Sequence, residues 1–306
     1  MDMRLKYISY SSLQTFHTCP RKYQLQKLQA DATEDSFDES VTFLFGHIVG
    51  EGIQLVLQGL PEEKIIFKLF LAWKLDLFAE DAKRMKSFWY AITAVQSFIS
   101  LRNAGLLSGY ELYYHNGIPA VEFSFKISLP EDFYYRGHVD AVLVHSETGE
   151  VLVLEVKTSS ATTINPAAYK NSAQAVGYSI VLDSLFPSLS SYKVCYLVYK
   201  TKSLEFEAPF EFTKTHLQRA LWLNELLLDT KTILMYEEAG TYPMRGENCL
   251  EFFRECKYFN ICTLSTSHLS SPLSESKKDE LENTPYTVNL TFEQLIYDQL
   301  TNLGVK

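Results

Sequence analysis

The segment Gly137-His-Val-Asp-Ala-Val-Leu-Val-His-Ser-Glu-Thr-Gly-Glu-Val-Leu-Val-Leu-Glu-Val-Lys-Thr158 consists of two β-rich runs joined by a short polar link. Glycine in such a link is typical of a β-hairpin. We therefore predict strands at residues 135–145 and 150–157. If the hairpin is symmetric about residues 147 and 148, Asp140 lies opposite Glu155. Facing residues project from the same side of a sheet, with Cβ atoms about 4.5–5.5 Å apart.

This hairpin would gather two carboxylates and an amine on one face, because Lys157 lies two residues after Glu155. Carboxylates this close among apolar neighbours repel each other, so one raises its pKa or a cation binds between them. Carboxylate oxygens suit Mg²⁺, which can activate a water molecule and stabilise charge on a phosphoryl group. The alternative is a charge trio on a solvated face, and a slip of one residue would move Asp140 to the other face.

The sequence patterns divide the 306 residues into five parts. These are an N-terminal segment at 1–29, a helical region at 30–115, an α/β core at 116–240, a cysteine segment at 241–264, and a flexible linker with a terminal helix at 265–306.

Shorter patterns predict the individual elements. The first helix has Ser11 or Ser12 as its N-cap and buries Leu13 and Phe16. The remaining predictions are helical pattern over 41–106, a half-buried strand at 120–128, a helix at 165–183, a buried strand at 191–199, a helix at 213–238, a linker at 265–290 and a capping-box helix at 291–303.

The composition is ordinary for a soluble globular protein, with 46% hydrophobic and 21% charged residues. The net charge of −9 argues against a broadly basic nucleic-acid coat but allows a local basic groove. No stretch approaches the ~20 apolar residues of a membrane span, so we expect no membrane association and a cytoplasmic location. Residues that could line a basic groove are Arg21, Lys22, Lys157, Lys170, Lys193, Lys200, Lys202, Arg254 and Lys257.

Several motifs stand in order over residues 7–264. They are Tyr10-Ser-Ser-Leu-Gln-Thr-Phe16 with Cys19-Pro-Arg-Lys-Tyr23, Phe45-Gly46, Gly137-His-Val-Asp140, Glu155-Val-Lys157-Thr158, Gln174-Ala-Val-Gly-Tyr178, and the late cysteines Cys249, Cys256 and Cys262. The ordered set resembles the PD-(D/E)XK nuclease superfamily, in its RecB-like and AddB-like iron–sulfur branch. That branch includes the CRISPR adaptation exonuclease (the fourth Cas protein) and phage-encoded relatives.

The resemblance implies a restriction-endonuclease-like α/β fold, in which a small mixed sheet is flanked by helices. It also implies the roles of the site residues. They are Asp140, Glu155 and Lys157 as catalytic residues, Asp140, Glu155 and the Val156 carbonyl as ligands of Mg²⁺ or Mn²⁺, Gln174 and Tyr178 as DNA-binding residues, and Cys19, Cys249, Cys256 and Cys262 as ligands of a [4Fe–4S] cluster.

The sequence departs from the family pattern at two positions. Members with Phe-Gly commonly place a metal-binding histidine four residues after the glycine, where this chain has Gly50. His47, on roughly the same helical face, could replace it as a metal ligand, and Glu51 is another candidate. The residue before Asp140 is Val139, where the name of the superfamily suggests proline.

The five cysteines favour a metal or redox role over disulfides, because their number is odd and the chain is large. The spacing of the three late cysteines is not that of a zinc knuckle, whereas a cubane cluster tolerates varied spacing but needs a fourth thiolate. Cys19 lies at a helix end before Pro20, and Cys195 lies mid-strand, where a buried core cysteine is common. We therefore expect Cys19 to be the fourth ligand, and a Zn²⁺ site with the same ligands is the alternative.

Together these features predict a metal-dependent DNA exonuclease that hydrolyses phosphodiester bonds, by resemblance from single-stranded ends, in recombination or DNA processing. A phage-encoded protein would act in the host cytoplasm. The first alternative is a catalytically inactive DNA-binding or assembly subunit, which Gly50 supports. The second is a zinc-stapled interaction protein without a DNA role. The helix at 291–303 would dock on its own domain or bind a protein partner.

Overall fold

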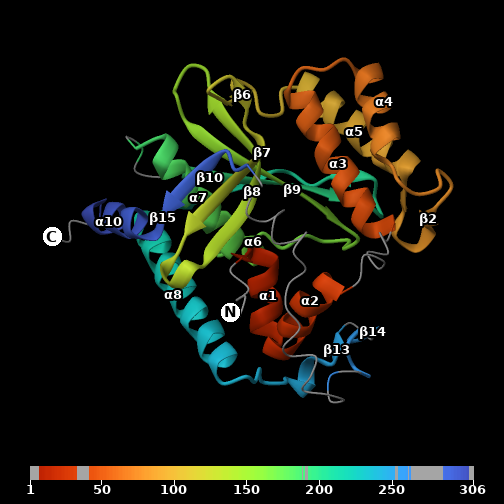
Figure 1. Cartoon of the computed structure of the whole chain (residues 1–306). Coiled ribbons are helices and arrows are strands. Elements are labelled where there is room, and N and C mark those ends of the chain that lie inside the picture. Colours follow the sequence, from red (N-terminus) through yellow and green to blue (C-terminus); the bar gives the residue numbers. More distant parts are fainter. Residues whose placement is uncertain are drawn as a thin grey trace. The chain divides into compact units, whose positions relative to one another are not determined.

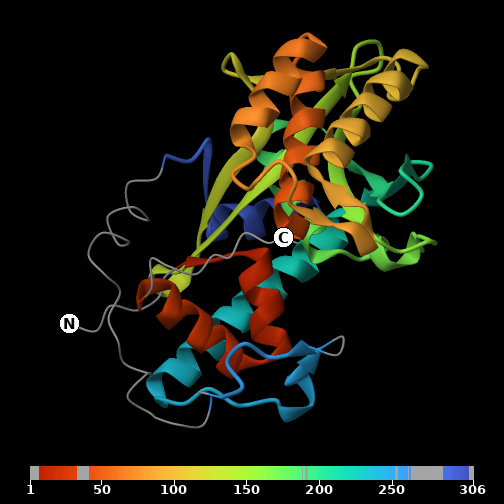
Figure 2. The same ribbon diagram turned by 90° about the vertical axis from the view of Figure 1, so that its right-hand side faces the viewer.

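The computed structural model describes residues 7–32, 41–187, 189, 192–251, 254–260, 262 and 285–302 (Figures 1 and 2). The chain divides into two compact units. The central unit consists of Phe37–Phe123 and His138–Arg219, and the terminal unit consists of Met1–Ser36, Ser124–Gly137 and Ala220–Lys306.

Nine of the described strands form one large mixed sheet, in which the main order is β11-β10-β9-β8-β7-β15. Strands β8 and β9 are antiparallel, whereas β9 and β10, and β7 and β15, are parallel. Strands β1 and β4 also pair with β8, and β12 pairs with β10. The strands of this sheet are β1 (Tyr7–Ile8), β4 (Tyr110–Leu112), β7 (Val121–Ser128), β8 (Tyr134–His145), β9 (Val151–Ser159), β10 (Tyr192–Lys200), β11 (Glu205–Phe206), β12 (Phe210–Lys214) and β15 (Val288–Thr291).

The register predicted for the hairpin is confirmed. Ala141 pairs with Leu154 and Val144 with Val151, which is the predicted register, and Asp140 and Glu155 follow directly after the last paired residues. The turn closes through a hydrogen bond from the Gly149 N–H to the His145 carbonyl. The first five residues of β9 are buried, because β9 lies between β8 and β10 inside the sheet.

Three helices cover part of the sheet within the central unit: α3 (Val41–Leu57), α4 (Glu62–Ala72) and α5 (Phe88–Asn103). They lie side by side in both views (Figures 1 and 2). Their apolar residues share one core with β8, β9 and β10, in which Phe45, Phe98 and Leu154 are fully buried. The helical pattern expected over 41–106 is broken at Gly59, which has a positive φ of 76°, and after Trp73, so Phe78 lies outside any helix and is exposed.

The terminal unit contains α1 (Tyr10–Thr18), α2 (Pro20–Ala32), most of α8 (His216–Glu238) and α10 (Phe292–Asn302). The N-cap of α1 is Ser9, so the prediction of Ser11 or Ser12 is wrong. The capping box pairs Ser9 with Ser12, because each side chain accepts the backbone N–H of the other residue. Leu13 and Phe16 are buried, as predicted.

Two further predictions need correction. The helix expected at 165–183 is two helices, α6 (Ala167–Lys170) and α7 (Ala173–Leu185), because Ser172 has an extended ψ of 118°. The helix expected from residue 213 begins at His216, because β12 occupies Phe210–Lys214 in pairing with β10.

The terminal helix α10 buries Phe292 and Leu295, which supports docking on its own unit. The expected linker lies outside the described residues up to residue 284. In the described part of the chain, no helix is long and apolar enough to cross a membrane. The remaining elements are β2 (Glu80–Asp81), η1 (Ala82–Arg84), β3 (Lys86–Ser87), β5 (Tyr114–His115), β6 (Ile118–Pro119), η2 (Pro130–Asp132), η3 (Gly246–Asn248), β13 (Leu250–Glu251) and β14 (Arg254–Glu255).

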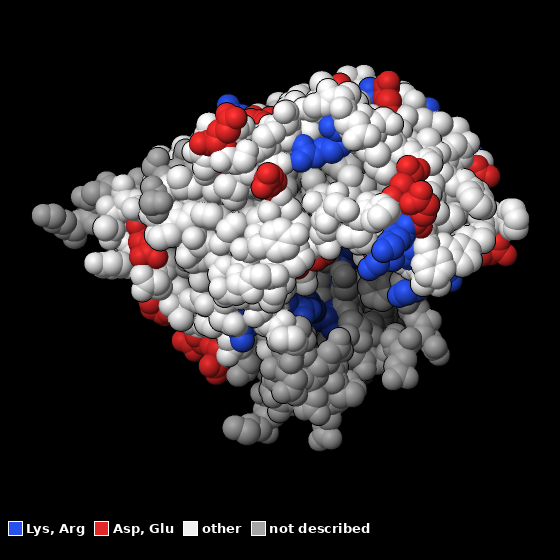
Figure 3. All heavy atoms as spheres, turned by 90° about the horizontal axis from the view of Figure 1, so that it is seen from above, with Lys and Arg blue, Asp and Glu red and all other residues white. Residues whose placement is uncertain are grey.

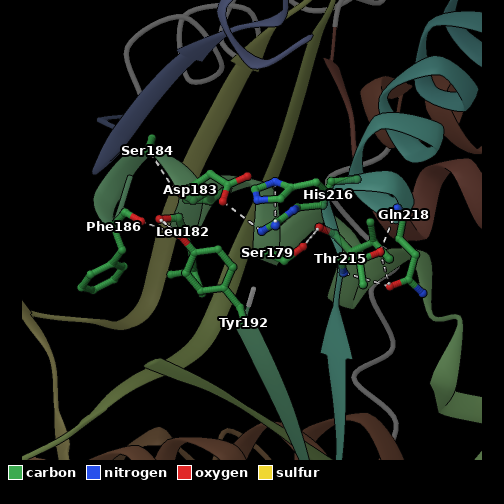
Figure 4. A network of polar contacts seen from close by, with 12 residues as sticks. Ser179, Leu182, Asp183, Ser184, Phe186, Tyr192, Thr215, His216 and Gln218 are labelled. Atoms are coloured by element: carbon green, nitrogen blue, oxygen red, sulfur yellow. Dashed lines mark hydrogen bonds and ion pairs between the residues drawn. The ribbon is translucent and has the colours of Figure 1, made fainter. Parts of the chain in front are cut away.

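A buried ion pair joins α7 to α8 in the central unit. The Arg219 guanidinium, which is fully buried, donates to Asp183 Oδ1 at 2.9 Å and lies over the Tyr192 ring. It also lies 3.0 Å from His216 Nδ1. Figure 4 shows Asp183, Tyr192 and His216 of this network converging from α7, β10 and α8. The Tyr192 hydroxyl donates in turn to the Phe186 carbonyl.

We expect Asp183→Ala to lower the free energy of unfolding by about 3–5 kcal/mol, because it leaves the Arg219 charge buried without its carboxylate. Urea denaturation followed by circular dichroism measures the change. Glu205→Ala is the matched control, since Glu205 pairs with Lys200 at the same 2.9 Å but is 59% exposed. Equal losses in both variants would contradict a special role for the buried pair.

Candidate active site

The hairpin holds Asp140 and Glu155 next to each other at the point where β8 and β9 separate. The backbone pairing ends at Ala141 and Leu154, and the Val156 N–H donates instead to Asp140 Oδ2 at 3.0 Å. In a strand, the N–H and C=O of one residue point to the same neighbouring strand. The Val156 carbonyl is therefore directed to the side of Asp140 as well.

The Glu155 side chain is only 1% exposed and forms an ion pair through Oε1 with Lys157 Nζ. Its other oxygen, Oε2, is buried without a hydrogen-bond donor among the described residues. Burial raises the pKa of Glu155, and the neighbouring Lys157 ammonium opposes this shift. The alternative of a charge trio on a solvated face therefore does not hold.

Asp140 lies near the negative charge of the Glu155 carboxylate. Burial raises the pKa of Asp140 well above its ordinary value, and the negative charge of Glu155 raises it further. The Val156 N–H and the Lys157 ammonium act in the opposite direction. Keeping both carboxylates ionised therefore costs free energy unless an additional cation binds near them.

A chain of hydrogen bonds leads from Lys157 into α7. Lys157 Nζ donates to Gln174 Oε1 at 3.2 Å, and Gln174 Nε2 donates to the Tyr178 hydroxyl at 2.5 Å. Gln174 and Tyr178 lie one helical turn apart, and Gln174 is half-buried. Tyr178 is 5% exposed, so its hydroxyl is placed to orient Gln174. The structure therefore brings together five of the residues that the sequence singled out.

The profile of the PD-(D/E)XK nuclease superfamily matches residues 7–263. The chain belongs to this superfamily. Membership indicates a metal-dependent nuclease with DNA as its substrate, without distinguishing a branch of the superfamily.

Nine chains of solved structures match this superfamily member. One of them, described as "Crystal structure of SSO0001", has 16% sequence identity and a TM-score of 0.27, and the match covers 70% of this chain and 84% of that chain. A TM-score this low supports no structural argument. No curated protein sequence matches the chain.

The PD-(D/E)XK hairpin fits a divalent metal ion. The observation that decides this is the buried Glu155 Oε2, which lacks a donor among the described residues and lies beside the Asp140 carboxylate. Hard carboxylate and carbonyl oxygens are the donors that Mg²⁺ and Mn²⁺ prefer. Asp140, Glu155 and the Val156 carbonyl provide this donor set.

His47 lies on α3, the helix that packs against β9. A Cβ at Gly46 would contact Thr158 Oγ1 at 3.4 Å, which places this turn of α3 next to the end of the catalytic strand. The His47 side chain is 59% exposed, and its Nε2 lies 4.0 Å from Glu51 Oε2. Within the described ranges, no group of three or more His, Cys, Asp or Glu side chains is arranged to hold a metal ion. A ligand role for His47 or Glu51 thus stays a prediction.

Glu122 on β7 is an acidic residue near the site that the sequence pattern did not reveal. Its negative charge raises the pKa of both Asp140 and Glu155, and its Oε1 accepts a hydrogen bond from Gln54 Nε2 at 2.8 Å. The alternation over 120–128 assigned Glu122 to the polar face of a strand. Only the pairing of β7 with β8 relates this residue to Asp140.

The structure places Cys19 near the three late cysteines in the terminal unit. Burial raises the pKa of the Cys249 thiol, and the neighbouring thiols of Cys256, Cys19 and Cys262 raise it further. Three hydrogen bonds tie these segments together: Cys256 N–H to the Cys249 carbonyl (2.8 Å), Arg21 Nη2 to the Cys262 carbonyl (3.3 Å) and Asn248 Nδ2 to the Thr18 carbonyl (2.5 Å). In contrast, Cys195 is buried in the core of the central unit, where burial raises its pKa to about 12.

Among the described residues of the face drawn in Figure 3, basic side chains form no continuous band. In the described part of that face, Lys and Arg occur as separate small groups with Asp and Glu between them. Three of the candidate groove lysines, Lys157, Lys193 and Lys200, are paired with carboxylates.

We expect Asp140→Asn to raise the melting temperature of the metal-free protein at pH 7.5–8. The folded-state pKa of Asp140 lies above its unfolded value, so stability is lost as pH rises from about 4 through the folded pKa. Each kcal/mol of relieved repulsion adds roughly 2–4 °C in a domain of 150–250 residues. Thermal melts in EDTA over pH 5–8.5 measure the effect.

Adding Mn²⁺ at pH 8 should make the wild-type protein melt at a higher temperature than Asp140→Asn. The metal should stabilise the wild-type protein more at pH 8 than at pH 5.5, because protons compete for the same carboxylates. It should stabilise Asp140→Asn little. Glu111→Gln, at an exposed carboxylate of β4, is the control and should behave as wild type. A metal-free Asp140→Asn protein that melts below wild type at pH 8 would contradict the repulsion.

Proposed function

We propose that the protein is a metal-dependent DNA exonuclease that acts on single-stranded ends, in recombination or DNA processing. The observation that carries this proposal is the buried Glu155 carboxylate, held between Asp140 and Lys157 with one oxygen lacking a donor among the described residues. Such an arrangement is costly for a purely structural site and suits a site that binds a cation.

Each residue of the hairpin has a distinct task in this mechanism. Asp140, Glu155 and the Val156 carbonyl would hold Mg²⁺ or Mn²⁺, which supplies an activated water and stabilises charge on the phosphoryl group. The Lys157 ammonium, oriented by Glu155 and Gln174, stabilises the negative charge that develops on the phosphate oxygens. Gln174, fixed by Tyr178, offers its amide to the phosphate backbone.

We also propose that Cys19, Cys249, Cys256 and Cys262 hold a [4Fe–4S] cluster of the RecB-like and AddB-like branch, with Zn²⁺ as the alternative. The effect of Cys256, Cys19 and Cys262 on the pKa of the Cys249 thiol supports this ligand set. The cluster would tie the end of α1 to the segment after α8, and it supplies covalent bonds between them. Free thiols of this kind fit a reducing compartment such as the cytoplasm.

We expect Glu155→Ala and Lys157→Ala each to lower kcat/KM on end-labelled single-stranded DNA by roughly 10²–10⁴-fold with Mn²⁺. Lys64→Ala, at an exposed lysine of α4, is the matched control and should retain full activity. Equal degradation by all variants would contradict the assignment. A wild-type protein that binds DNA but never cleaves it would favour the alternative of an inactive DNA-binding subunit, which the glycine at position 50 supports.

We expect Cys249→Ser to lose the iron and sulfide of anaerobically purified protein, together with the visible absorption of the cluster. The same variant should melt at a lower temperature, because the two segments are no longer joined. Cys195→Ser is the control and should keep the cluster, since Cys195 lies in the apolar core of the central unit. Zinc without iron or sulfide in the wild-type protein would select the alternative metal.

A further inference from the structure

The first residues of β8, which belong to the terminal unit, carry a ring and a cation on the open face of the strand. Successive residues of β8 alternate between the two faces. Tyr135 is 3% exposed and faces the core, whereas Tyr134 and Arg136 on either side of it are half-buried. The open face of this part of β8 is therefore available to a ligand, on the strand that also carries Asp140.

Five side chains form one chain of contacts on this face. Tyr7 of β1 pairs with Tyr134 in the parallel register of β1 with β8, and their ring centroids lie 5.2 Å apart. The Arg136 guanidinium lies 5.6 Å from the centroid of the Tyr7 ring. Lys126 Nζ of β7 lies 5.0 Å from the centroid of the Tyr134 ring and 5.5 Å from that of Tyr286. We refer to these five residues as the tyrosine cluster.

The two cations of the tyrosine cluster keep their positive charges. Among the described residues, no carboxylate forms an ion pair with Lys126 or Arg136. By contrast, Lys157, Lys193 and Lys200 are each paired with a carboxylate. An aromatic ring attracts a cation through its quadrupole and does not neutralise it. The tyrosine cluster therefore presents two positive charges that can attract an anion.

The phosphate backbone of DNA fits this arrangement better than the bases do. Lys, Arg and Tyr side chains are common donors to phosphate oxygens. The stacked faces of Tyr7 and Tyr134 contact each other at an interplanar angle of 26°, so bases cannot insert between them. The ring contacts also restrict the two cations, which lowers the conformational entropy lost when a ligand binds. Membership of the nuclease superfamily indicates that the polyanion is DNA.

We propose that the tyrosine cluster binds the phosphate backbone of the DNA substrate, with Lys126 and Arg136 each contacting one phosphate and the tyrosine rings holding both cations in place. The proposal rests on the nuclease function proposed above and adds a binding surface outside the hairpin that holds the metal. Backbone contacts carry no sequence information, so this surface binds strands of any sequence. Neither cation is among the basic residues that the sequence suggested for a groove.

Binding of fluorescein-labelled single-stranded DNA, followed by fluorescence anisotropy in EDTA, tests these contacts separately from catalysis. Lys126→Met and Arg136→Met keep an apolar side chain against the rings and remove the charge. We expect each to weaken binding by about fivefold at about 0.1 M salt, and to lower the slope of log K against log salt by about 0.7. The double variant should lose about 25-fold. Lys64→Met, at an exposed lysine of α4, is the matched control.

Further comparisons separate a binding role from a structural one. Arg136→Lys keeps the charge and should retain most of the affinity that Arg136→Met loses. A lower melting temperature with unchanged DNA affinity in the methionine variants would mean that the cluster only stabilises the fold, which overturns the inference. The losses should be equal for oligo-dT and oligo-dA, and unequal losses would overturn the assignment to the backbone. Where Arg136→Met does not fold, a wild-type salt slope in Lys126→Met overturns the inference.

Cleavage by the same proteins in Mn²⁺ distinguishes failure of this inference from failure of the proposed function. If Lys126→Met and Arg136→Met bind DNA as wild type while Glu155→Ala abolishes cleavage, the role of the tyrosine cluster is overturned and the nuclease function stands. If Glu155→Ala cleaves as wild type, the proposed function is overturned whatever the binding results. Weaker binding in the two methionine variants, together with cleavage that depends on Glu155, supports both.

Discussion

The antiparallel register of β8 with β9 sets the positions of Asp140, Glu155 and Val156 in the candidate active site. It places Asp140 beside Glu155, and the end of backbone pairing at this point leaves the Val156 N–H to the Asp140 carboxylate. A shift of one residue would turn Asp140 to the opposite face of the sheet. The apolar residues that precede Glu155 on β9 are buried inside the sheet, so their packing specifies the register.

The same packing buries the carboxylates, so it costs free energy to keep them ionised. Burial raises the pKa values of Asp140 and Glu155, the charge of Glu155 raises that of Asp140 further, and the Lys157 ammonium opposes both shifts. A purely structural network would gain stability by losing one of these charges. The arrangement is therefore best understood as a site whose charge balance is completed by a cation, in a chain that belongs to a nuclease superfamily.

The terminal unit is built from segments that lie far apart in the sequence, so contacts between them must hold it together. Residues near Cys19 contact those near Cys249 and Cys262 through hydrogen bonds that the Arg21 and Asn248 side chains donate to backbone carbonyls. These hydrogen bonds by themselves contribute little net free energy to holding the segments together. The Cys249 thiol lies close enough to the thiols of Cys19, Cys256 and Cys262 for them to raise its pKa, so the four cysteines meet where these segments approach each other.

The local patterns of the sequence were sufficient to predict the hairpin, its register, the buried face of α1 and the strand β10, because periodicity and turn residues act within a few positions. They failed where neighbours decided the outcome: β12 shortens α8 because it pairs with β10, and Ser9 caps α1 because Ser12 completes the box. The chemistry of Asp140, Glu155 and Lys157 follows from their spacing on two adjacent strands. The approach of Glu122, Gln54, Gln174 and Cys19 to their partners was decided only by the tertiary structure, since strand order and helix packing join residues whose separation in sequence carries no signal.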